Sequence, residues 1–142
     1  MEHNNNSKSE FIGFDTFWGL PDAWGEFDKG AFSTEGRLPA INDPRCCFVK
    51  GSFQETLVNT LPRIDFRRKT VVHLDADLYT STLYVLMLLA NKFKKDDIII
   101  FDEFGSPLHE FRAFSDFIQT MNFRYTVLGY THCYSSVAMK FV

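Results

Sequence analysis

The sequence has no long apolar segment, no apolar leader and no excess of positive charge. Its longest apolar run spans only residues 85–90, far short of the roughly 20 residues of a membrane-spanning helix. The first ten residues are polar, unlike the apolar stretch of a signal peptide. The 15 basic residues are outnumbered by 18 acidic ones, which argues against a broad nucleic-acid surface. We therefore expect neither a membrane nor a nucleic acid as a partner.

Cysteine is scarce, and its spacing is not that of a zinc site. The three cysteines are Cys46, Cys47 and Cys133, and neither a C-x-x-C pair nor a histidine cluster accompanies them. The simplest interpretation is reduced thiols in an intracellular protein, so we predict a cytoplasmic location.

Phenylalanine, by contrast, is abundant, at 16 of 142 residues. So much bulky apolar area predicts a thick core, an aromatic-lined pocket or a buried subunit contact. Hydrophobic residues make up 45% of the chain, which excludes disorder over most of its length. We expect a disordered leader at residues 1–10 and a single domain at residues 11–142.

Hydrophobic periodicity predicts strands that alternate with helices. The predicted strands are residues 11–17, 46–50, 70–74, 97–101, 124–128 and 136–142. The predicted helices are residues 52–61, 81–95 and 110–121. A capping box of Ser52 and Glu55 opens the first helix, and a basic turn closes the second. This order indicates an α/β fold with a mostly parallel sheet, flanking helices and a C-terminal antiparallel hairpin.

Two further features bear on the site. Residues 19–43 are rich in Gly, Pro and Asp, which predicts a long loop with a binding function. His73 lies within a predicted strand, so we expect it to be a core histidine.

Acidic residues follow three of the predicted strands. Asp15 lies near the end of the first, Asp75 and Asp77 follow the third, and Asp102 and Glu103 follow the fourth. Ligands bind at the carboxyl ends of parallel strands, so the last four acids are expected to share one edge of the sheet. Without a cation, carboxylates packed so closely would repel one another.

A hard divalent cation would relieve this repulsion, and Mg²⁺ prefers oxygen ligands. Asp75, Asp102 and Glu103 are therefore candidate ligands, and Asp77 is a candidate general base. Alternatively, the acids cap helices or hold loop amides. Asp15 is a candidate acceptor for ribose hydroxyl groups, or simply a turn residue.

Five segments, taken in order, carry a resemblance to a known family. They are GFDTFWGLPDAW at 13–24, FDKGAFSTEGRLP at 27–39, VKGSFQETL at 49–57, HLDADLYTST at 73–82 and IIIFDEFGSP at 98–107. Together they resemble the class I S-adenosylmethionine-dependent methyltransferases of the macrocin-type sugar O-methyltransferase group. The HLDADLYTST segment, paired with FDE, is the most specific part.

The resemblance implies a Rossmann-like fold and two cofactors, S-adenosylmethionine and Mg²⁺. It implies that the metal is bound by Asp75, Asp102 and Glu103, and that Asp77 is the base. It further implies that Asp15 lies near the cofactor ribose, and that the residues near the adenine are Gly51, Ser52 and Phe53.

The sequence departs from this family in one respect. Family members begin with a strand that ends in a glycine-rich turn, where the backbone approaches the cofactor, and no such segment precedes Phe11. We therefore predict a domain that is N-terminally truncated relative to the family. The strands at 11–17 and 70–74 then pair directly, or another chain fills the gap, or the sheet splits. An exposed strand edge beside a Phe-rich surface predicts a homo-oligomer.

Three functions are compatible with these residues. The first is a Mg²⁺-dependent O-methyltransferase that transfers a methyl group to a hydroxyl of a sugar or similar small molecule. The second is a truncated, catalytically inactive methyltransferase-like protein that oligomerises and binds only a metal or small ligand. The third is a structural oligomer whose acids are solvated loop ends.

Overall fold

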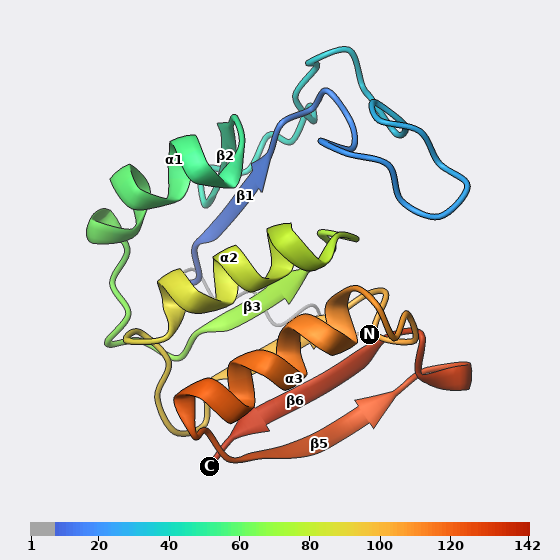
Figure 1. Ribbon diagram of the computed structural model, residues 1–142. Coiled ribbons are helices and arrows are strands. Elements are labelled where there is room, and N and C mark those ends of the chain that lie inside the picture. The colour runs from blue at the N-terminus through green and yellow to red at the C-terminus, as the bar shows by residue number, and fades with distance from the viewer. Residues whose placement is uncertain (1–7) are drawn as a thin grey trace. The chain divides into compact units, whose positions relative to one another are not determined.

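A computed structural model describes residues 8–142, which form two compact units divided at Thr56 and Leu57 (Figure 1). The predicted leader at residues 1–10 lies largely outside the described residues. Among residues 8–142, none of the helices combines the length and apolar character needed to cross a bilayer.

The first unit contains a two-stranded parallel sheet of β1 (Phe11–Asp15) and β2 (Cys46–Lys50). The strands end together, since Asp15 lies opposite Lys50. The α-helix α1 (Phe53–Thr60) begins immediately afterwards and continues into the second unit. The predicted capping box is confirmed, because the Glu55 carboxylate accepts from the Ser52 N–H at 3.0 Å and the Ser52 hydroxyl accepts from the Glu55 N–H at 3.3 Å.

The predicted long loop joins β1 to β2. Its regular pairing is limited to one isolated bridge between Trp24 and Phe27. Their rings stack at 5.6 Å, and Phe32 lies 4.9 Å from Phe27. The Leu20 N–H also donates to the Ala31 carbonyl at 2.9 Å, so aromatic contacts and backbone hydrogen bonds together hold the loop.

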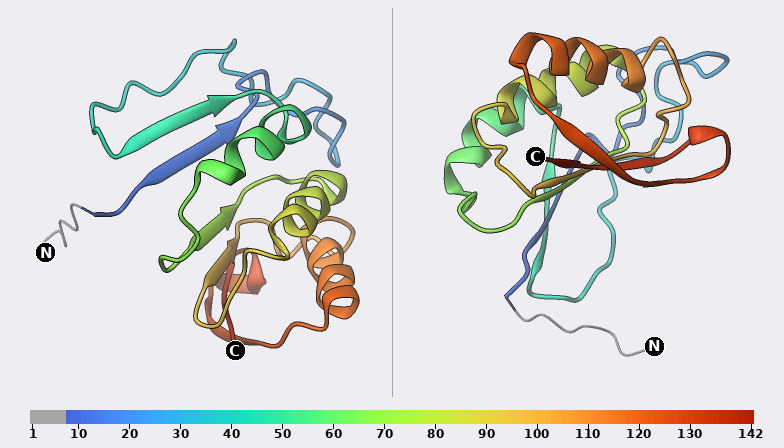
Figure 2. Two further views of the ribbon diagram at one scale, coloured as in Figure 1. Left: turned by 90° about the vertical axis from the view of Figure 1, so that its left-hand side faces the viewer. Right: turned by 90° about the horizontal axis from the view of Figure 1, so that it is seen from below.

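The second unit contains a four-stranded sheet in the order β3-β4-β6-β5. Its elements after α1 are a 3-10 turn (Leu61–Arg63), β3 (Val71–Leu74), α2 (Tyr79–Leu89), β4 (Ile98–Phe101), α3 (Glu110–Met121), β5 (Tyr125–Tyr130), a second 3-10 turn (His132–Tyr134) and β6 (Val137–Phe141). β3 and β4 are parallel, whereas β6 is antiparallel to both β4 and β5. Figures 1 and 2 show α2 and α3 side by side on one face of this sheet. The α/β class and the C-terminal hairpin are confirmed.

The core of the second unit lies between these two helices and the sheet. Its fully buried side chains include Phe101, Phe117, Phe141, Leu86, Ile99 and Met139. Phe93 joins them, 4.7 Å from the Phe141 ring and 6.1 Å from the Phe117 ring. Much of the phenylalanine of the sequence therefore forms one thick core.

One prediction about the elements needs correction. The second helix covers Tyr79–Leu89 rather than residues 81–95, because the chain turns away to place Phe93 in the core and the Lys94 N–H against the Asp97 carboxylate at 3.0 Å. The basic turn therefore lies beyond the helix. Within residues 8–142, β1 does not pair with β3 and the strands form two sheets, which matches one of the three predicted outcomes for the gap.

Candidate functional site

The acids that follow β3 and β4 lie at the same edge of the second unit's sheet. β3 and β4 are parallel neighbours, and their last residues, Leu74 and Phe101, lie opposite each other. The ladder continues one step further, because the Asp102 N–H donates to the Leu74 carbonyl at 3.0 Å. Asp75 and Asp102 thus leave the sheet at neighbouring positions, as expected for acids at the carboxyl ends of parallel strands.

The four carboxyl groups at this edge are close enough to influence one another. Burial, followed by the negative charges of Asp75, Glu103 and Asp102, raises the pKa of Asp77 to about 6. Burial and the charges of Asp102 and Asp75 also raise the pKa of Glu103. The electrostatic convergence that the sequence predicted is therefore present.

The donor chemistry of this edge suits a hard cation. Carboxylate oxygens are the ligands that Mg²⁺ prefers, and mutual repulsion of the kind described above is what a cation would relieve. Among residues 8–142, however, no three His, Cys, Asp or Glu side chains lie close enough together to hold a metal ion as they stand. Metal binding would require these side chains to draw together.

Asp77 has an unusual backbone conformation. Its φ of 55° lies in the left-handed region, which few residues other than glycine adopt, although aspartate tolerates it better than most. The chain reverses here, between the end of β3 and the start of α2 at Tyr79. Such conformations cluster at functional sites, where the surrounding structure maintains them.

Asp102 has two neighbours that the sequence did not indicate. The Ser136 hydroxyl, just before β6, lies 3.1 Å from the Asp102 carbonyl oxygen and 3.3 Å from its carboxylate. His73 Nε2 lies 3.7 Å from the same carboxylate. The expectation of a core histidine at position 73 was wrong: the residue lies on the sheet's exposed side, and 56% of its side chain is accessible.

Glu110 is the main residue that sequence analysis missed. It is fully buried at the start of α3, where its two carboxylate oxygens accept from the N–H groups of Ala76 and Glu103. Burial raises the pKa of Glu110 to about 7, aided by the charges of Asp77 and Asp75, although the two N–H groups act in the opposite direction. The amphipathic pattern placed Glu110 in a helix but carried no signal of its burial.

The candidate cofactor residues lie together at one edge of the first unit. The Gly51 N–H donates to the Asp15 carbonyl at 3.0 Å, and Ser52 and Phe53 follow directly. The Asp15 carboxylate accepts a hydrogen bond from the Phe17 N–H, as its interpretation as a turn residue predicted. Gly51 has a φ of 142°, and a Cβ there would lie 2.9 Å from Thr56 Cγ2, so the position requires glycine.

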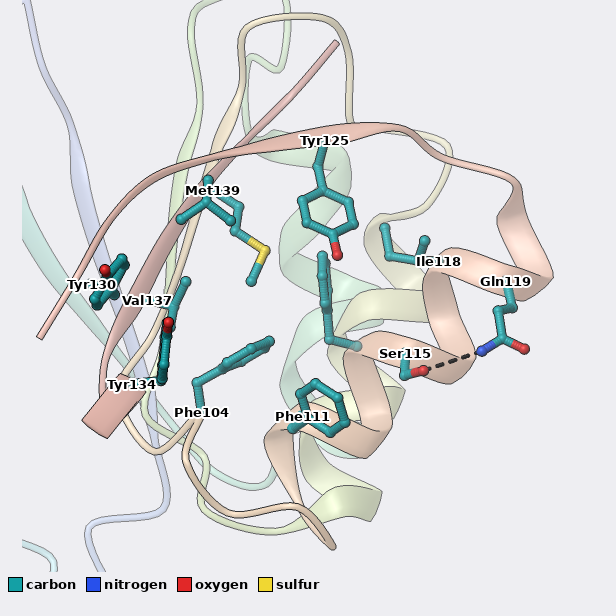
Figure 3. Close-up of a pocket in the computed structure, with 12 residues that line it drawn as sticks. Phe104, Phe111, Ser115, Ile118, Gln119, Tyr125, Tyr130, Tyr134, Val137 and Met139 are labelled. Atoms are coloured by element: carbon teal, nitrogen blue, oxygen red, sulfur yellow. Dashed lines mark hydrogen bonds between the residues drawn. The ribbon is translucent and has the colours of Figure 1, made fainter. Parts of the chain in front are cut away.

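A pocket of about 570 Å³ lies between α3 and the β5–β6 hairpin (Figure 3). Its walls are mainly aromatic, with Phe104 and Phe111 at one end and Tyr125 and Tyr130 on the hairpin. Figure 3 shows the Tyr125 hydroxyl directed into the pocket toward α3. Phe104 directly follows Glu103, so the pocket adjoins the loop that carries two of the acids. The expectation of an aromatic-lined pocket is confirmed.

Comparison with known families identifies the chain. The model of the macrocin O-methyltransferase family, TylF, matches residues 36–127, well over half of the chain. The chain belongs to the TylF family. Among curated proteins, none is similar enough to match.

Two solved structures share the fold of this TylF family member. The O-methyltransferase NovP has a TM-score of 0.67 at 22% identity, over 92% of this chain and 59% of its own. The calicheamicin methyltransferase CalS11 has a TM-score of 0.70 at 20% identity, over 92% of this chain and 60% of its own. The TylF-family chain described here therefore spans about three fifths of their length and has a Rossmann-like methyltransferase fold.

Proposed function

We propose that the protein is an O-methyltransferase that moves a methyl group from S-adenosylmethionine to a hydroxyl of a sugar or a similar small molecule. The observation that carries this proposal is the family match over residues 36–127, which includes both acidic loops. The convergence of four carboxyl groups at the carboxyl ends of β3 and β4 supports it further.

The acids at the second unit's sheet edge are proposed to bind Mg²⁺ and activate the acceptor. Asp75, Asp102 and Glu103 would hold the metal, and Asp77 would act as the general base. When bound, Mg²⁺ lowers the pKa of a hydroxyl that it contacts and orients it. Asp77 would accept the hydroxyl proton as the acceptor oxygen forms its bond to the methyl carbon. The carbon–sulfur bond would break, and its electron pair would stay on sulfur.

The edge formed by β1 and β2 is proposed to bind the cofactor. One Asp15 carboxylate oxygen accepts from the Phe17 N–H, which leaves the carboxylate further capacity to accept from ribose hydroxyls. Gly51, Ser52 and Phe53 would lie against the adenine. Glycine at position 51 permits the φ of 142° with which the chain turns from β2 into α1 at this edge.

Calorimetric titration with S-adenosylmethionine, with and without Mg²⁺, tests the proposal directly. We expect saturable cofactor binding, and methyl transfer to a sugar hydroxyl when the metal is added. Metal binding without any affinity for S-adenosylmethionine would favour the catalytically inactive alternative. The absence of both would contradict each of these functions and favour a structural oligomer.

The metal ligands can be tested with the double variant Asp75→Asn and Asp102→Asn. Mutation of residues that only support metal ligands lowers affinity about 10- to 100-fold, so loss of two ligands is expected to weaken Mg²⁺ binding by more than about 100-fold. The matched control is Asp65→Asn with Asp96→Asn, which removes the same charge from two surface ion pairs, with Arg67 and Lys140. Unchanged affinity in the first variant, measured by calorimetry, would exclude the proposed ligands.

We also propose that the protein is cytoplasmic.

Copies of the chain are further proposed to associate. Every residue of the edge strand β5 is exposed, and Val127, Leu128 and Tyr130 are each more than half accessible. Exposed apolar edge strands favour association with another chain. Light scattering at micromolar concentration is expected to give a mass above 16.5 kDa. A clean monomer would contradict the proposed association.

A further inference from the structure

The loop after β3 and the loop after β4 are joined by one buried side chain. Glu110 is the first residue of α3 and is 0% exposed. Its Oε1 accepts from the Ala76 N–H at 3.2 Å, and its Oε2 accepts from the Glu103 N–H at 3.0 Å. A single carboxylate therefore bridges two segments that lie far apart in the sequence.

The two N–H groups lie on the two loops that carry the acids of the proposed site. Ala76 lies between Asp75 and Asp77, and Glu103 follows Asp102 directly. Any movement of Glu110 would shift both loops at once. The bond from the Asp102 N–H to the Leu74 carbonyl extends the β3–β4 pairing by one step, and the two bonds to Glu110 connect the loops beyond it.

The chemistry of the bridge fits a positioning role better than a purely stabilising one. The two oxygens of a carboxyl group can each accept a hydrogen bond at the same time, as they do here. Burying a carboxylate is unfavourable, however, and apolar side chains of similar volume often stabilise a core equally well. What an apolar residue cannot do is fix two backbone amides at a set separation.

We infer that Glu110 is a positioning residue for the two acidic loops. This inference rests on the function proposed above. Its carboxylate sets the separation between Asp75 and Asp77 on one loop and Asp102 and Glu103 on the other, so that these acids can close on one cation. Glu110 itself would not contact the metal or the acceptor, because both of its oxygens face backbone N–H groups.

The test is the variant Glu110→Gln, with Mn²⁺ binding followed by electron paramagnetic resonance. Glutamine has the same length, but its amide offers one acceptor oxygen, and its NH₂ group would face the second backbone N–H. We expect Mn²⁺ affinity to fall about 10- to 100-fold, as for other residues that orient metal ligands. Amide exchange at Ala76 or Glu103 is expected to accelerate in the same variant, without metal.

A control separates positioning from general destabilisation. Phe117→Leu alters a buried residue of the same helix, two turns from Glu110, and is expected to leave Mn²⁺ affinity within twofold while lowering stability. An equal loss of affinity in both variants, or no loss in Glu110→Gln, would overturn the positioning role and leave the proposed function intact. A wild-type chain that binds no Mn²⁺ would overturn the proposed metal site, and the positioning role with it.

Discussion

Replacing Asp97 with alanine is expected to lower the free energy of unfolding by about 3–4 kcal/mol. Asp97 is 1% exposed and precedes β4. Its carboxylate accepts from the Thr70 N–H at 2.9 Å and from the Lys94 N–H at 3.0 Å, and it pairs with the Lys94 ammonium at 2.9 Å. Alanine would leave two backbone donors without their acceptor and remove the ion pair. Urea unfolding followed by far-ultraviolet circular dichroism measures the loss.

The neighbouring residue provides the control for Asp97. Asp96 is largely solvent-accessible and pairs with Lys140 at 3.2 Å on the surface. Asp96→Ala is expected to cost less than about 1 kcal/mol, because exposed ion pairs contribute little. Equal losses for the two variants would mean that the buried network around Asp97 does not stabilise the second unit.

Replacing Phe117 with alanine is expected to cost about 3–5 kcal/mol, the range for deletion of a fully buried aromatic side chain. Phe117 is 0% exposed on α3, and its ring stacks on Phe123 at 5.5 Å. The neighbouring Phe93 ring comes from a segment without regular structure. Loss of the Phe117 ring would therefore loosen the docking of that segment as well as leave a cavity. The unfolding midpoint in urea measures the change.

A second phenylalanine of α3 offers the comparison for this variant. Phe111 is 47% exposed and lies 5.3 Å from Phe104 at the pocket. Phe111→Ala is expected to cost about 1 kcal/mol, because only part of the ring is buried. Equal losses for Phe111→Ala and Phe117→Ala would contradict the prediction that burial of the ring decides the cost.

Local patterns predicted most of the elements correctly. The strand at 46–50 and the helix at 110–121 match the structure at both ends, because turn residues or periodicity define each within a few positions. The predicted end of the second helix was wrong. Its apolar spacing continues to Phe93, but the chain leaves the helix after Leu89, where Phe93 contacts the distant Phe141 and the Lys94 N–H donates to the Asp97 carboxylate.

In the candidate site, too, some features could be predicted from the sequence and others could not. Asp75 and Asp102 could be expected at one sheet edge because strand ends and parallel pairing follow from the order of elements. The bond from Ala76 to Glu110 joins residues 34 positions apart, and no local signal in the sequence foretells it. His73 was misassigned because a position within a strand does not indicate which face the side chain occupies.

The division of the chain at Thr56 also partitions its natural fluorophores. Both tryptophans, Trp18 and Trp24, belong to the first unit, whereas all five tyrosines lie in the second. Selective excitation of indole therefore monitors one unit, and the near-ultraviolet signals of the phenol rings monitor the other. A single unlabelled sample can reveal whether the units melt together or one after the other, because coincident transitions are the mark of two-state unfolding.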